Sequence, residues 1–315
     1  MKNKIKQNIK NPALVCIIAC FCCLLWGSAF PTIKIGYNLL SVESNDYMSQ
    51  ILFAGVRFFL AGVFTIIIGS IMTKSLVKVR KQGLYKIPVL ALFQTILQYL
   101  FFYIGLAKTT GTKSSILDST SVFFSVLIAS IILKQEKLSV RKIIGCLLGF
   151  GGVVTVNLSG GSFDTSMSFM GEGFIILSAL SYAVSSVLIK QYSRNDNPVA
   201  LSGYQFILGG LVMIAVGLIG GGRLNFSSIK AFCIILYLAL LSAVAYTLWG
   251  ILLKYNPVSR VTVFGFMTPV FGCILSSVLL NESIGDNGIK IFFALILVSL
   301  GIIMVNLKKK GDLND

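Results

Sequence analysis

The sequence contains two copies of one ordered set of landmarks. Residues 24–34 recur in outline as residues 180–190, and residues 60–62 recur as residues 208–210. Later in each copy, Glu136 pairs with Glu282 and Gly152 pairs with Gly301. Self-similarity of this kind predicts a chain built from two structurally equivalent halves, so whatever one half folds into constrains the other.

The chain is far more apolar than a soluble domain. Hydrophobic residues make up 56% of it, charged residues only 12%, and the mean hydropathy is +0.87, whereas soluble domains carry roughly 25% charged residues. Its apolar stretches are about as long as the 20-residue helix that crosses a bilayer, and they lack the alternation of barrel strands. They lie at 13–36, 48–73, 87–107, 114–133, 142–158, 172–192, 199–220, 231–253, 260–280 and 288–307. We therefore expect an all-α membrane protein with ten transmembrane helices.

The basic residues concentrate at the chain ends and in alternate connections between the apolar stretches. The formal net charge is +16, and most of the 27 Lys and Arg residues lie near the two chain ends or in alternate connections, at 74–86, 134–142, 190–194 and 254–260. By the positive-inside rule, both termini are expected to be cytoplasmic. Because the basic residues are spread over short loops and form no single patch, the charge indicates the lipid bilayer as partner and argues against nucleic acid.

Each half is expected to contain five spans, which is an odd number. The second copy must then enter the membrane from the opposite side, so the two five-helix repeats are inverted relative to each other. Inverted repeats are typical of secondary transporters, in which the substrate site lies between the repeats near the membrane midplane.

Several landmarks resemble those of one known family. They are Trp26-Gly27 followed by Pro31 and Lys34 in the first span, residues 57–62 in the second span, and the glutamates Glu136 and Glu282 after the fourth and ninth spans. In order, spacing and duplication they are similar to the EamA family of the drug/metabolite transporter superfamily. The resemblance covers nearly the whole chain, as EamA-like repeats at 13–158 and 172–307.

The resemblance implies a multi-pass transporter of the cytoplasmic (inner) membrane, and it points to a bacterial protein. Members are often exporters of amino acids or other small polar metabolites, and the resemblance leaves the individual substrate open. One position departs from the family pattern. The family often has a proline in the fourth span as well as in the ninth, whereas here Pro269 aligns with Phe123, which puts a kink at that point of the first half in question.

Ionisable side chains inside the spans are few, and each needs a physical reason to be there. Arg57 lies deep in the second span and Asp118 lies in the outer half of the fourth. They could pair and lock two helices together. Alternatively, they face a central cavity, where Arg57 attracts a carboxylate and Asp118 attracts an amine or exchanges a proton. Lys34 and Lys190 lie near opposite ends of equivalent spans, where they either extend to the headgroups or serve in gating.

Comparison of the two copies separates the scaffold from the candidate site. Arg57 aligns with Gln205 and Asp118 aligns with Phe264, so these charges are not required by the repeated unit. Both copies keep aromatic residues at two positions, which line a cavity or form interface belts. Gln94 and Gln98 share one helical face, for substrate or for another helix. The candidate substrate-binding residues are Trp26, Arg57, Gln94, Gln98, Tyr103, Asp118, Tyr182, Gln205 and Trp249, and the candidate gating or coupling residues are Lys34, Asp118 and Lys190.

Nothing in the sequence indicates a catalytic or metal centre. The chain has no histidine, and its seven cysteines lack the paired spacing of a metal site. We therefore expect no metal and no cofactor, and we expect a secondary active transporter of small polar solutes that is open to proton coupling. The alternatives are an integral membrane enzyme acting on lipid-linked substrates and a passive channel. The sequence leaves open whether the protein is a monomer or a homo-oligomer.

Overall fold

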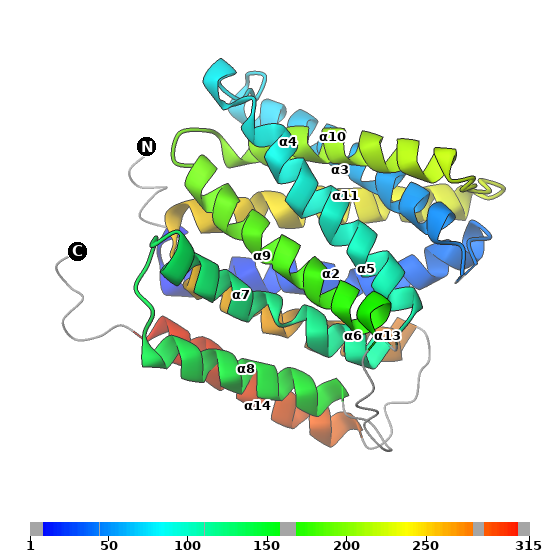
Figure 1. Cartoon of the computed structure of the whole chain (residues 1–315). Helices are drawn as coiled ribbons and strands as arrows, with labels where there is room; N and C mark the ends of the chain where they lie inside the picture. Colours follow the sequence, from blue (N-terminus) through cyan, green and yellow to red (C-terminus); the bar gives the residue numbers. More distant parts are fainter. Residues whose placement is uncertain (1–8, 44, 110, 158–167, 280–286, 308–315) are drawn as a thin grey trace.

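The computed structural model describes residues 9–43, 45–109, 111–157, 168–279 and 287–307. All regular structure in this part of the chain is helical, and the helices run side by side in one bundle (Figure 1). Nine helical segments of the described residues are long and apolar enough to cross a membrane. This confirms the expected all-α membrane fold. Glu282 lies outside the described residues, as does the boundary residue at position 158.

The first half contains five spanning segments. They are α2 (Pro12–Leu39); α3 (Tyr47–Thr73); α4 (Lys86–Ala91), η2 (Leu92–Leu97) and α5 (Gln98–Ala107), which together make the third span; α6 (Gly111–Asp118), α7 (Ser121–Leu127) and η3 (Ile128–Ile132), which make the fourth; and α8 (Val140–Asn157). A short helix, η1 (Lys81–Gly83), precedes the third span. α8 corresponds to the fifth expected span, at 142–158, and is the one span that is not among the nine candidate membrane helices. It packs along α14 (Asn287–Asn306), the last helix of the second half.

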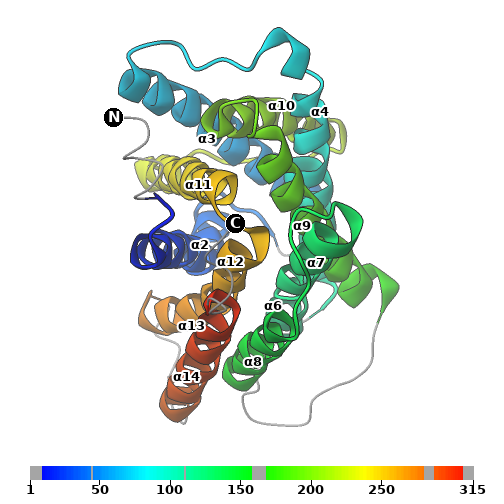
Figure 2. The same ribbon diagram turned by 90° about the vertical axis from the view of Figure 1, so that its left-hand side faces the viewer.

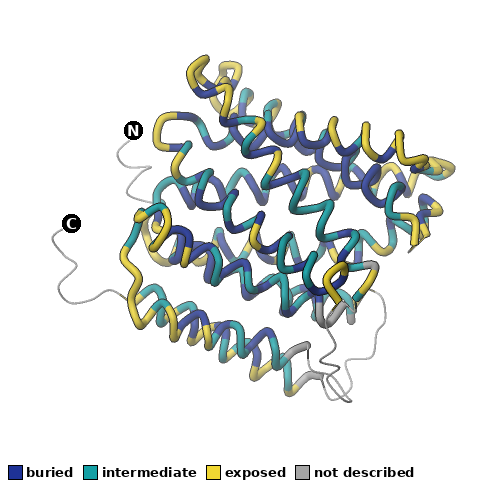
Figure 3. The backbone as a smooth tube through the Cα atoms, viewed as in Figure 1, coloured by how far each residue is buried: buried dark blue, intermediate teal, exposed yellow. Residues whose placement is uncertain are grey.

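The second half repeats this order. Its spans are η4 (Phe169–Gly173) with α9 (Phe174–Tyr192); α10 (Pro198–Ile219); α11 (Ile229–Tyr255); α12 (Val258–Thr262), η5 (Val263–Phe266) and α13 (Met267–Leu279); and α14 (Asn287–Asn306). Many large apolar side chains are exposed, as expected for lipid contact. Figure 3 shows exposed residues recurring along the outer helices.

Equivalent helices of the two halves cross in opposite directions at close range. Gly55 of α3 lies against Gly210 of α10, and Gly62 of α3 lies against Gly203. A Cβ atom on Gly62 would approach the Gly203 carbonyl oxygen to 2.6 Å, and one on Gly210 would approach the Phe59 amide nitrogen to 2.4 Å. Since Gly55 and Gly62 are the repeat equivalents of Gly203 and Gly210, these contacts exchange under a two-fold rotation. We call these four residues the glycine spine.

α8 and α14 make the second contact of this kind. Gly145 of α8 lies against Gly301 and Val305 of α14, and Gly152 lies against Val298. An earlier residue of one helix again meets a later residue of its counterpart, so the pair is antiparallel. Both contacts agree with the inverted arrangement expected from five spans per half.

The first helix of each half packs against the other half. α2 lies against α11 and α13, whereas α9 lies against α5 and α7. Figure 2 shows the bundle from its end, with α2 beside α11 and α13, and α9 beside α7. Because the halves interlock in this way, the centre of the bundle receives side chains from both copies.

The fourth and ninth spans are interrupted at equivalent positions. α6 ends at Asp118 and α7 begins at Ser121, and in the other copy η5 separates α12 from α13. The first-half break therefore forms although Phe123 replaces the proline. The Ser119 hydroxyl donates to the Ile116 carbonyl oxygen at 2.6 Å, and local hydroxyl bonds of this kind compete with the helical ladder and bend helices.

The two ends of the bundle differ in their connections. The α3–α4, α7–α8, α9–α10 and α11–α12 connections lie at the same end as the start of α2 and the end of α14 (Figure 1). Two hydrogen bonds illustrate this: Asn256 donates to the Ile9 carbonyl oxygen, and Arg260 donates to Asn306. We call this the basic end, because these connections and the adjoining helix ends carry most of the described Lys and Arg residues. The other, called the pocket end, holds the α2–α3 and α10–α11 connections.

Candidate functional site

Aromatic rings from both halves meet at the centre of the bundle. The Trp26 ring of α2 has its centroid 6.4 Å from that of Tyr182, 5.1 Å from that of Tyr246 and 4.9 Å from that of Trp249. The three partners belong to α9 and α11 of the second half. Trp26 and its repeat equivalent Tyr182 are therefore in direct ring contact.

A second group of rings continues this contact toward the pocket end. The hydroxyl groups of Tyr99 and Tyr246 are 2.8 Å apart, which joins α5 to α11 by a hydrogen bond. The Phe58 ring packs on Tyr99 at 4.4 Å and on Phe206 at 5.2 Å. Tyr103 adjoins Tyr99 at 6.2 Å. We call the whole set the aromatic cluster: Trp26, Phe58, Tyr99, Tyr103, Tyr182, Phe206, Tyr246 and Trp249.

Arg57 borders this cluster and is deeply buried, with 3% of its surface exposed. Its Nε and Nη2 atoms donate to the Ser242 hydroxyl of α11 at 3.1 and 2.9 Å, and that hydroxyl donates onward to the Leu238 carbonyl oxygen. The guanidinium lies 5.1 Å from the centre of the Phe58 ring, and the Tyr103 hydroxyl is close by. No described carboxylate pairs with it, so a buried positive charge is held by neutral groups alone.

Asp118 lies elsewhere, at the break between α6 and α7. It is half-buried, and it forms no hydrogen bond or ion pair with any described residue. α6 packs against α5, α8 and α9, and the carboxylate lies within electrostatic reach of Tyr182. The ion pair between Arg57 and Asp118 that the sequence allowed is thus not formed, because Arg57 turns toward α11.

Several buried polar atoms around the cluster lack a hydrogen-bond partner among the described residues. They are Trp26 Nε1, Trp249 Nε1, Gln94 Oε1, Gln98 Oε1 and Gln205 Nε2. The Gln205 oxygen is satisfied, since it accepts from the Thr95 hydroxyl at 2.8 Å. An unpaired buried polar group costs about 1–3 kcal/mol and is uncommon in folded proteins. Their concentration here favours a region that takes up water or a polar ligand.

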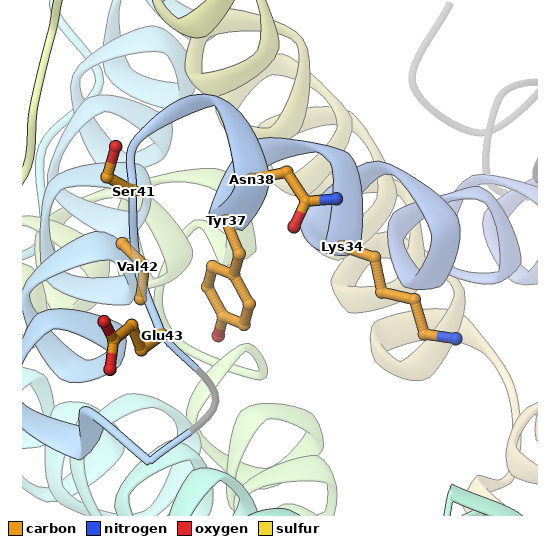
Figure 4. A pocket seen from close by; sticks show the side chains of 6 residues that line it. All are labelled: Lys34, Tyr37, Asn38, Ser41, Val42 and Glu43. Atoms are coloured by element: carbon orange, nitrogen blue, oxygen red, sulfur yellow. The ribbon is translucent and has the colours of Figure 1, made fainter.

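The two candidate gating lysines have different surroundings. Lys190 donates to the carbonyl oxygens of Leu253 and Asn256 at the C-terminal end of α11. A cation at this negative end of the helix dipole stabilises the contact between α9 and α11. Lys34 is exposed at the pocket end, where it lines a pocket of about 730 Å³ together with Tyr37, Asn38, Ser41, Val42 and Glu43 (Figure 4).

Tyr37 lies between the pocket and the candidate site. The Tyr37 hydroxyl is buried without a hydrogen-bond partner among the described residues, and it lies close to Tyr103 and Arg57. Tyr37, Tyr99 and Tyr246 are not among the candidate substrate-binding residues predicted from the sequence. For Tyr99 and Tyr246, helical spacing is the signal that could have indicated them, because each lies one turn before a candidate residue, Tyr103 or Trp249.

The basic end is closed by polar contacts between the halves. The Lys86 ammonium lies 2.5 Å from the Asp196 carboxylate, and Arg80 donates its backbone N–H to the same carboxylate. The Glu136 carboxylate accepts from the backbone N–H and hydroxyl of Ser259 at 2.9 and 2.7 Å. It also pairs with Lys142 at 3.0 Å.

Comparisons with known proteins agree with this architecture. An uncharacterized transporter of Archaeoglobus fulgidus is 29% identical over 82% of this chain and 86% of its own. The uncharacterized transporter YvbV of Bacillus subtilis is 25% identical over 94% and 92%. A solved crystal structure superposes with a TM-score of 0.75 over 93% of this chain and 96% of its own, at 17% identity, which supports the fold alone.

The model of the EamA-like transporter family matches residues 13–158 and 169–307. These two segments contain the interlocking helices, the aromatic cluster and Arg57. The chain belongs to the EamA-like transporter family.

Proposed function

We propose that the protein is a secondary carrier for small solutes that bear a carboxylate and an amine, with amino acids as the leading class. The observation that carries this proposal is the buried Arg57. Its charge is held by a serine hydroxyl and aromatic rings, so it retains the capacity to bind a carboxylate strongly in a site of low polarity.

The surroundings of Arg57 support an organic solute over an inorganic anion. The aromatic cluster offers ring faces and edges to an apolar side chain, and the unpaired indole and amide groups offer directed hydrogen bonds. Both halves contribute to this region, as alternating access about a central site requires. A passive channel needs no such enclosed set of partners.

The two ends suggest the state of the carrier. The basic end is closed by contacts between the halves, whereas the other end holds the pocket. With the positive-inside rule, the basic end and both termini face the cytoplasm and the pocket faces outward. On this basis we infer an outward-facing state, in which an exporter releases its solute.

Asp118 is the candidate coupling group in this scheme. It stands at a helix break, a position that often carries ion or substrate contacts in transporters. It also has no described partner that would hold it permanently ionised. The ammonium group of the solute and a proton would compete for the Asp118 carboxylate. We favour export of the solute coupled to proton uptake.

The test uses purified protein in sealed liposomes loaded with unlabelled L-phenylalanine. We expect saturable uptake of external labelled L-phenylalanine by exchange. Arg57→Gln installs the residue found at the equivalent position of the second half. It should lower the exchange rate roughly thirtyfold, which corresponds to about 2 kcal/mol of lost binding free energy. Arg223→Gln removes an exposed arginine of the α10–α11 connection and serves as the matched control. Exchange by Arg57→Gln at the unaltered rate would refute the role of Arg57.

The same liposomes separate the two alternative functions. A channel would pass the label without saturation and without stimulation by internal solute. An enzyme would return chemically altered solute, which chromatography of the recovered label detects. A carrier returns the label unchanged.

A further inference from the structure

The α3–α4 connection exposes a row of positive charges at the basic end. Lys74, Lys78, Arg80 and Lys81 are all exposed, and residues 74–86 contain no acidic residue. The nearest carboxylate across the bundle, that of Asp196, is buried and paired with Lys86. The exposed charges of this connection are therefore not offset within it.

The backbone of the connection directs these charges away from the bundle. Val77 and Val79 are buried whereas Lys78 between them is exposed, which is the alternation of an extended chain. The Val77 N–H donates to the Ser70 hydroxyl oxygen at 3.1 Å, and the Tyr204 hydroxyl of α10 donates to the Val77 carbonyl oxygen at 3.3 Å. Because this stretch is fixed to α3 and α10, its basic side chains are presented from an anchored segment.

Large apolar side chains are exposed in the same connection. Leu76, Leu84 and Tyr85 are 57%, 53% and 62% exposed. Figure 2 shows the connection running along the outer edge of the bundle, beyond α10. Exposed leucine and tyrosine side chains beside lysine and arginine are typical of a segment that lies at the level of the lipid headgroups.

The same connection also contacts the second half. Gly83 lies so close to Asp196 that a Cβ atom on it would approach the Asp196 Oδ2 atom to 2.7 Å. The Tyr85 ring packs edge-on against the Tyr192 ring of α9, with 6.4 Å between the centroids. With the ion pair of Lys86 and Asp196, these contacts form a joint between the α3–α4 and α9–α10 connections. Whatever binds the exposed side of the α3–α4 connection also acts on this joint.

We propose that the α3–α4 connection binds the headgroup of an anionic phospholipid and that the bound lipid stabilises the joint. The exposed bases receive the lipid phosphate, and the exposed apolar side chains pack beside its acyl chains. By the positive-inside rule this end faces the cytoplasmic leaflet, whose anionic lipids attract basic segments close to the membrane. The site does not depend on which solute the protein carries.

A binding experiment tests the site. Fluorescence anisotropy follows a fluorescently labelled phosphatidylglycerol on the detergent-purified protein. We expect unlabelled phosphatidylglycerol to compete about tenfold better than phosphatidylcholine, and glycerol 3-phosphate, which has no acyl chains, to compete least. Lys78→Gln with Arg80→Gln should weaken binding about tenfold, and less so in high salt.

The matched control is Lys134→Gln with Lys137→Gln. Both lysines are exposed in the α7–α8 connection at the same end, and their removal changes the net charge equally, but Glu136 lies between them. This variant should bind phosphatidylglycerol within about twofold of the parent protein. Equal losses in the two double variants, or equal competition by phosphatidylcholine, would overturn the site. Equal competition by glycerol 3-phosphate would assign the bases to a free phosphate and overturn the lipid.

Hydrogen exchange tests the effect on the joint. The protein is placed in bilayer discs of phosphatidylcholine with and without phosphatidylglycerol. We expect the anionic lipid to slow amide exchange about fivefold at residues 76–83 and 193–197 of the parent protein, and to leave the Lys78→Gln, Arg80→Gln variant unchanged. Exchange that ignores the lipid in the parent protein would overturn the effect on the joint. Solute exchange by Arg57→Gln bears only on the central site, so the two proposals fail separately.

Discussion

The two ends of the bundle are built from the same repeated unit, yet they differ in what their side chains do. At the basic end, the Asp196 side chain is 2% exposed and that of Lys86 10% exposed, and their ion pair joins the halves. At the pocket end, Lys34 and Glu43 are exposed and line an open surface pocket. The inverted scaffold is common to both ends, so the difference between them comes from individual side chains.

The largest expected effect concerns the closure of the basic end. Asp196→Ala leaves the largely buried Lys86 without its partner, and breaking one side of a buried pair costs about 3–5 kcal/mol. Chemical unfolding in detergent measures the loss. The double variant Lys86→Met with Asp196→Leu removes both charges and should recover most of it. If the double variant is no more stable than the single one, the ion pair does not hold this end.

The next effect concerns the glycine spine, which lies between the ends and belongs to neither. Gly210→Ala places a methyl group against the Phe59 backbone, and overpacking of this kind costs about 1–3 kcal/mol. Gly151→Ala is the matched control, since a Cβ there meets nothing within 4 Å. Thermal unfolding and the yield of monodisperse protein report the difference. Equal behaviour of the two variants would contradict the close helix contact.

A smaller effect separates charge from hydrogen bonding at the basic end. Glu136→Gln keeps an acceptor for the Ser259 hydroxyl but loses the ion pair with Lys142. We expect a loss of about 1 kcal/mol in unfolding free energy. The loss should persist in high salt, because the Glu136 and Lys142 side chains are shielded from solvent. A loss that salt abolishes would place this contact among ordinary surface pairs.

The smallest effect contrasts the helix caps of the two ends. The Ser49 hydroxyl and backbone N–H donate to Asp46 and hold its pKa below the usual range, so the cap is strongest while Asp46 is ionised. Its contribution is present above about pH 4 and is lost as the pH falls below that value. Asn197 caps α10 at the basic end without a titrating group.

Asp46→Ala and Asn197→Ala should each cost about 1 kcal/mol at pH 7. On acidification, the cost of Asp46→Ala should shrink, whereas that of Asn197→Ala should stay constant. Thermal unfolding of both variants and the parent protein between pH 7 and pH 3 measures the two trends. Parallel trends would show that Asp46 titrates without affecting its cap.

The groups that are expensive to bury can be predicted from the sequence. Arg57, Gln94, Gln98 and Gln205 stand out because a polar side chain inside an apolar span is rare, and the structure buries Arg57, Gln94 and Gln205 near the centre. Tyr37, Tyr99 and Tyr246 cannot be predicted in this way, because a tyrosine in a membrane helix is ordinary until its neighbours are known. The same holds for Asp196, which lies in a connection and becomes notable only through its contact with Lys86.

The pairing of Arg57 was likewise beyond the sequence. Depth along a helix can be counted from residue numbers, and both Arg57 and Asp118 lie within the membrane. The direction of a side chain depends on how the helix is rotated, and packing of α3 against α10 and α11 sets that rotation. Arg57 consequently meets Ser242, while Asp118 lies on α6 at the helix break.

The sequence by itself determined the duplicated unit, the apolar spans and the sorting of basic residues among the connections. These depend on composition and order along the chain, which are readable without coordinates. Only the tertiary structure decided at which end polar contacts join the halves, which rings meet at the centre and which partner Arg57 binds. Those outcomes depend on contacts between residues far apart in the chain, and in a bundle of equally apolar helices it is the close packing of small residues that selects them.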